Sequence, residues 1–78
     1  MENEKMPPIR LLYRELILKC REKGLTKDEI IVIGAMASDQ ESEDRFGELE
    51  AIRVAIKAVE RSRNSDEVFR NVRKDLQI

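Results

Sequence analysis

Half of the acidic side chains of this protein lie in the middle of its sequence. Residues 28–50 carry eight acidic side chains and one basic side chain. Four of these acids match positions one, three, five and twelve of a calcium-binding loop: Asp39, Glu41, Glu43 and Glu50. Asp44, however, stands where that loop needs a glycine for its sharp turn, and helical periodicity runs through the segment. We therefore predict no calcium site.

Carboxylates spaced along one helix also bind magnesium in helical hydrolases. Glu41 with Asp44, and Asp44 with Glu48, have suitable spacing. Such a site needs carboxylates from several helices, and the flanking segments offer only Glu15, Glu22, Glu67 and Asp75, at positions that a helical pattern places in solvent. A metal-dependent helical enzyme subunit is therefore the third of the functions that the sequence suggests, and we predict no bound metal.

Acid–base and nucleophilic catalysis lack their usual residues. The chain has no histidine, the side chain that most often moves protons at neutral pH. Cys20 is the one cysteine, and it lies four residues after Leu16 on the apolar side of a predicted helix. We predict a core position for Cys20, no catalytic residue, no cofactor and no enzymatic activity. A chain without an internal disulfide suits the reducing cytoplasm, where we expect this protein to reside.

Two features of the sequence suggest nucleic acid as an alternative partner. Gly24-Leu25-Thr26-Lys27-Asp28-Glu29 resembles the opening of the first motif helix in helix-turn-helix repressors. This six-residue resemblance implies a recognition helix over residues 38 to about 50, but that segment is acidic and phosphate would repel it. A separate basic rim follows on the last two predicted helices, and it defines the alternative function of a nucleic-acid-binding regulator: Arg53, Lys57, Arg61, Arg70, Arg73 and Lys74.

Eight consecutive apolar residues, 30–37, stand out in a chain of which 40% is charged. Thr26 and Glu29 have the spacing of a capping box, and Leu25 and Ile30 that of a hydrophobic staple, so a helix is favoured over a buried strand. A helix that is apolar on all sides needs cover on every side. We expect this cover from the rest of the chain or from a second copy or partner.

Apolar periodicity and capping residues predict four helices, over about 8–23, 27–37, 39–63 and 66–76. We expect an all-α, compact four-helix bundle in which the second and third helices form the core and the first and fourth flank them. Residues 1–6 are expected to be a disordered tail, and residues 7–78 a single domain. No apolar run approaches the length of a membrane span.

The bundle has more apolar helix surface than a chain of 78 residues readily hides. We therefore predict a small non-enzymatic protein–protein interaction or regulatory adaptor domain, a homodimer that associates through its first two helices. The expected apolar contacts are Leu11, Leu18, Ile31, Val32 and Met36. The expected acidic contacts are Asp39, Glu41, Glu43 and Asp44. Neither a membrane nor a small-molecule substrate is implied.

Overall fold

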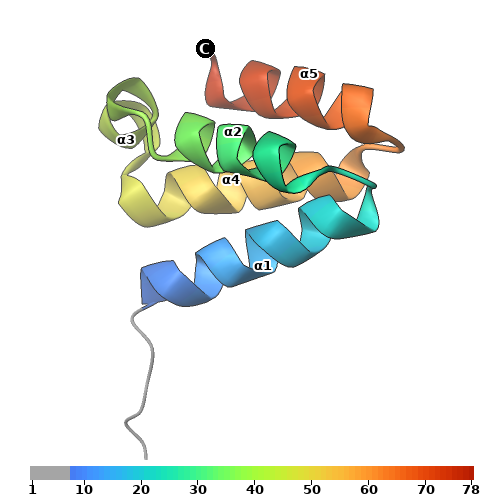
Figure 1. Cartoon of the computed structure of the whole chain (residues 1–78). Coiled ribbons are helices and arrows are strands. Elements are labelled where there is room, and N and C mark those ends of the chain that lie inside the picture. Colours follow the sequence, from blue (N-terminus) through green and yellow to red (C-terminus); the bar gives the residue numbers. More distant parts are fainter. Residues whose placement is uncertain (1–7) are drawn as a thin grey trace, which may run out of the picture.

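The computed structural model describes residues 8–78, which form five α-helices (Figure 1). They are α1 (Pro8–Glu22), α2 (Lys27–Ala37), α3 (Gln40–Phe46), α4 (Glu48–Arg61) and α5 (Ser65–Leu76). The described residues contain no strand, so the predicted all-α class is confirmed. The predicted tail over residues 1–6 lies outside the described residues, as does residue 7.

The central helix of the bundle is α4, which contacts each of the other four helices. In Figure 1, α1 and α5 flank α4 on opposite sides, α2 crosses the front between them, and α3 lies at one end. Six of the fourteen residues in α4 are buried: Ala51, Ile52, Ala55, Ile56, Ala58 and Val59. The core therefore lies along α4, within the third helix predicted from the sequence, and α2 adds only three buried residues to it.

The start of α2 is built as the sequence predicts. The Thr26 Oγ1 accepts a hydrogen bond of 3.2 Å from the Glu29 amide, and the Glu29 Oε1 accepts one of 2.8 Å from the Thr26 amide. Leu25 and Ile30 are both buried, as a hydrophobic staple requires. The capping box is therefore confirmed, and residues 27–37 are a helix and not a strand.

The single helix predicted over residues 39–63 is wrong. Gly47 has φ 86° and ψ 158°, a conformation that is open almost only to glycine, and it separates α3 from α4. In Figure 1, α3 is seen nearly end-on while α4 runs across the view. Asp39 caps α3 by accepting a hydrogen bond from the Glu41 amide, whereas the Ser38 hydroxyl donates back to the Gly34 carbonyl of α2. The count is therefore five helices and not four.

Replacing Gly47 with alanine is expected to lower the free energy of unfolding by about 1–3 kcal/mol, because alanine is strained in this conformation. The added Cβ would meet no atom within 4 Å, so crowding contributes nothing. Gly34→Ala is the control: its Cβ would lie 3.8 Å from the Tyr13 ring, an ordinary contact, and alanine favours the helix by about 1 kcal/mol. Urea denaturation measures both effects. A Gly47→Ala protein as stable as the wild type would contradict the strain at this turn.

Candidate functional site

The outer side of α2 is apolar and faces solvent. The buried residues of this helix are Ile30, Ile33 and Ala37. On the other side, the Ile31 side chain is 60% exposed and Val32 is 46% exposed. Together with the exposed Ala35 and the half-buried Met36, these two residues form what we call the α2 face. Within residues 8–78, the chain therefore leaves one side of this helix uncovered.

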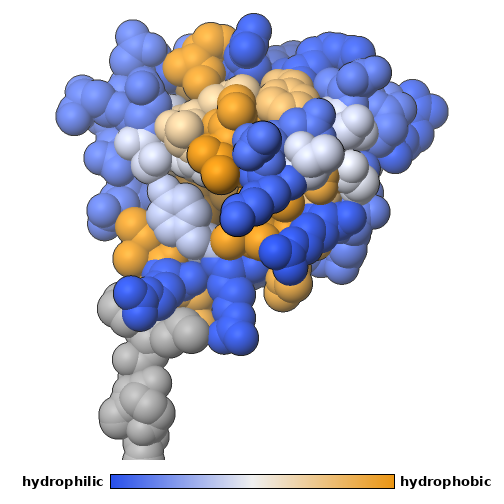
Figure 2. Space-filling model, viewed as in Figure 1, coloured by the Kyte–Doolittle hydropathy of each residue, from blue (hydrophilic) through white to orange (hydrophobic). Residues whose placement is uncertain are grey.

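The packing of α2 explains why one side stays open. This helix contacts α1, α3, α4 and α5, and the Tyr13 ring of α1 lies against Gly34. In Figure 1 no described helix lies in front of α2. Figure 2, drawn from the same side, shows hydrophobic surface over this part of the molecule, interrupted by hydrophilic side chains. The α2 face is therefore an apolar surface with a charged surround.

Acidic side chains border the α2 face at the start of α3. Asp39 and Glu41 line a shallow hollow of about 400 Å³ together with four apolar residues: Val32, Ala35, Met36 and Ile78. Two of the four acidic residues predicted as contacts therefore line the same hollow as Val32 and Met36, which are two of the predicted apolar contacts. Glu43 is half-buried, and Asp44 accepts a hydrogen bond from the Gln40 amide group, and neither lines the hollow.

The other predicted apolar contacts, Leu11 and Leu18, lie on a separate surface. They are 49% and 52% exposed, and helical spacing places them on the side of α1 opposite the buried Leu16 and Cys20. The predicted apolar surface of the first two helices is therefore divided between the α2 face and an outer stripe on α1. Sequence reasoning missed Ile78, which lies beyond the last predicted helix and yet borders the α2 face.

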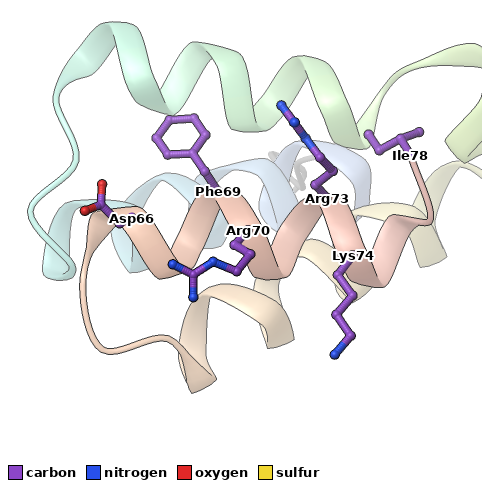
Figure 3. A pocket seen from close by; sticks show the side chains of 6 residues that line it. All are labelled: Asp66, Phe69, Arg70, Arg73, Lys74 and Ile78. Carbon is purple, nitrogen blue, oxygen red and sulfur yellow. The ribbon is translucent and has the colours of Figure 1, made fainter.

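The six basic residues of the predicted rim are distributed over three places. Arg53 and Lys57 line a groove between α1 and α4, with Glu15 and Glu60 beside them. Arg61 forms a bidentate ion pair with Asp75 of α5. The remaining three line a hollow along α5 (Figure 3): Arg70, Arg73 and Lys74. Within the described residues, these side chains do not form the one continuous rim that the sequence suggested.

The segment that the helix-turn-helix resemblance assigns to a recognition helix is not one helix. Residues 38–50 contain α3, the turn at Gly47 and the first residues of α4. A recognition helix enters the major groove as one continuous helix. The structure therefore does not support the arrangement that the resemblance implies.

Cys20 lies in the core, and the described acidic residues form no metal-ligating group. Among residues 8–78, no three histidine, cysteine, aspartate or glutamate side chains lie together in a group that could hold a metal ion. Cys20 is buried, as predicted, and burial raises the pKa of its thiol to about 11. The thiol is therefore protonated at neutral pH, and a protonated, buried thiol is a poor nucleophile.

Cys20 is expected to resist alkylation in the folded protein and to react quickly in denaturant. Because its pKa is raised above the usual 9.0 to about 11, the unfolded chain loses the thiol proton first as the pH rises. This group therefore lowers the stability of the fold progressively between about pH 9 and about pH 11. The rate of reaction with iodoacetamide, with and without urea, checks the expectation. Equal rates in the two conditions would contradict the buried position.

In the part of the chain that the structure describes, no helix combines the length and the apolar character needed to cross a membrane. Comparison of the chain with protein-family models, with curated proteins and with solved structures gave no match. The surface of the chain itself is therefore the basis for a functional proposal.

Proposed function

We propose that this chain is a small non-enzymatic domain for protein–protein interaction, or a regulatory adaptor, that self-associates through the α2 face. The observation that carries the proposal is the exposure of Ile31 and Val32, 60% and 46%, on a helix whose other side supplies the core. Burial of an aliphatic side chain of this size contributes about 1.5–3 kcal/mol. Because Ile31 and Val32 are about half exposed, a second chain that covers the α2 face gains about half of this free energy for each of them.

The α2 face is a better docking surface than the outer stripe of α1. Three of its residues line one hollow, and Ile78 from beyond α5 joins them there. Leu11 and Leu18 are separated by two helical turns, and single exposed apolar side chains are common on monomeric proteins. We therefore place the centre of the interaction on α2 and keep the α1 stripe as a second surface to be tested.

Nucleic-acid binding has weaker support from the same surface. A phosphate backbone is recognised by several cations that follow one track. Here the predicted cations are divided among three places, and Arg61 already pairs with Asp75. We therefore propose no nucleic-acid partner. Salt-sensitive binding to a short duplex, lost when Arg53, Lys57 and Arg61 are neutralised together, would instead favour that alternative.

Sedimentation velocity over a range of micromolar concentrations tests the proposal, together with binding of an apolar fluorescent dye. We expect the sedimentation coefficient to rise with protein concentration, because chains that cover each other's α2 face form larger particles. We also expect the dilute protein to bind the dye. A protein that remains a monomer throughout would overturn the self-association, and one that also binds no dye would overturn the interaction surface itself.

A further inference from the structure

We propose that the self-association is a two-fold symmetric dimer centred on the groove between α2 and α5, in which the acidic edge of each copy faces the basic edge of the other. This inference rests on the proposed function, because it takes the α2 face as the docking surface. It adds the second helix of that surface, the identity of the partner and the pairing of charges across the contact.

The groove consists of two hollows that meet at Ile78. The first is the hollow over α2 described above, and the second, of about 610 Å³, runs along α5. Ile78 lines both, so the two hollows adjoin at this residue, and we call the pair the α2–α5 groove. In Figure 3, Phe69 and Arg73 extend from α5 toward α2, and Ile78 lies near one end of α2. The floor of the groove is apolar: Val32, Ala35, Met36, Phe69 and Ile78.

The two edges of the α2–α5 groove carry opposite charges. Asp39 and Glu41 line the hollow on one side of Ile78. The hollow on the other side is basic on balance, because it is lined by one acid, Asp66, and by three cations: Arg70, Arg73 and Lys74. Of these cations, Arg73 extends toward α2 (Figure 3). Both Glu41 and Arg73 are exposed. Among the described residues, neither takes part in an ion pair within the chain. Both charges are therefore available to a second chain.

This arrangement of acidic and basic edges fits a second copy of the chain better than a partner whose surface carries charges of one sign only. An acidic partner in the groove would meet Asp39 and Glu41, and a basic partner would meet Arg73, and such like-charge contacts oppose binding. Consider a two-fold axis that lies in the contact plane near Ile78 and runs at right angles to the line from the acidic edge to the basic edge. Rotation about this axis brings the acidic edge of each copy onto the basic edge of the other. In such an isologous interface each favourable contact occurs twice.

Two single charge reversals test the pairing: Glu41→Lys and Arg73→Glu. Asp39 is left unchanged because it caps α3. In either variant alone, both symmetric contacts become like-charged. We expect the dimer dissociation constant to rise about tenfold or more, because two attractive contacts are replaced by two repulsive ones. In an equimolar mixture of the two variants, the heterodimer pairs unlike charges at both contacts. We therefore expect the mixture to associate about as strongly as the wild type.

Matched controls make the same charge changes away from the groove. Glu48→Lys reverses an exposed acid in the first turn of α4, as Glu41→Lys does in the first turn of α3. Lys57→Glu reverses an exposed cation on α4. Both controls are expected to dimerise like the wild type, and circular dichroism verifies that every variant is folded.

The possible outcomes separate this inference from the proposed function. Weak association of both single reversals, with recovery in the mixture, supports the inference. Reversals that dimerise like the wild type, or a mixture that fails to recover, overturn the charge pairing although self-association itself stands. A wild-type protein that binds the apolar dye and stays monomeric overturns both the symmetric dimer and the proposed self-association, and leaves the α2 face to a different protein. A monomer that binds no dye overturns the interaction surface as well.

Discussion

The Ile52→Ala variant is expected to lose about 2–5 kcal/mol of unfolding free energy, the cost of deleting most of a fully buried aliphatic side chain and leaving a cavity. Ile52 has no exposed surface, and it lies on α4, which contacts every other helix. Native domains are stable by only about 5–15 kcal/mol, and a small one lies near the lower end of that range. This one substitution is therefore expected to remove a large part of the stability of the fold.

Urea denaturation followed by circular dichroism measures this loss. Leu18→Ala is the matched control, because it removes an aliphatic side chain of equal size from a site that is 52% exposed. We expect this control to shift the stability by less than about 0.5 kcal/mol, as surface substitutions usually do. If Ile52→Ala lowered the free energy of unfolding no more than Leu18→Ala does, the core would not lie along α4.

The double variant Ile31→Gln, Val32→Gln is expected to abolish self-association with little change in stability. Both side chains are exposed, and glutamine has a higher helix propensity than a β-branched residue, so α2 is expected to form as before. Covering the exposed part of Ile31 or Val32 contributes about 0.8–1.5 kcal/mol, so the loss of two such side chains per chain raises the dissociation constant about a hundredfold or more. Sedimentation equilibrium measures the constant.

The matched control is Leu11→Gln, Leu18→Gln, which makes the same kind of change on the outer stripe of α1. Its residues are exposed to a similar extent, 49% and 52%. We expect this control to dimerise as the wild type does. Loss of association in the control, with normal association of the α2 variant, would move the docking surface from α2 to α1.

The features that the sequence predicts correctly are those set by neighbouring residues. Thr26 and Glu29 form a capping box wherever a helix begins between them, because both hydrogen bonds lie within four residues. Asn64 caps α5 in a similar way, by accepting a hydrogen bond from the Glu67 amide. Local signals of this kind, with apolar periodicity, are sufficient for the all-α class and for the approximate bounds of α1, α2 and α5.

The break at Gly47 could not be predicted from periodicity, because Phe46 and Leu49 keep helical spacing on either side of it. A glycine inside a helical pattern is tolerated or ends the helix according to the backbone angle that the tertiary fold imposes. Gly34 and Gly47 show the two outcomes: Gly34 lies inside α2, and Gly47 adopts a positive φ between two helices.

The candidate site could be predicted only in part, for a related reason. Val32 and Met36 lie four residues apart on α2, and Asp39 follows two residues after this helix ends, so their common surface follows from their closeness in the sequence. Their proximity to Ile78 depends on the packing of α2 against α5, which are far apart in the chain. The exposure of Ile31 also follows from the arrangement of helices, since nothing in a run of apolar residues indicates which of them the fold leaves uncovered.

Methyl NMR of isoleucine-labelled protein, recorded over a dilution series, tests most directly whether a second chain covers the α2–α5 groove. Ile78 lines the groove and Ile31 is exposed next to Val32 on the α2 face, whereas Ile33 and Ile52 are fully buried. We expect the methyl resonances of Ile31 and Ile78 to move with protein concentration while those of Ile33 and Ile52 stay nearly constant. Resonances of Ile31 and Ile78 that do not change while the protein associates would contradict this expectation.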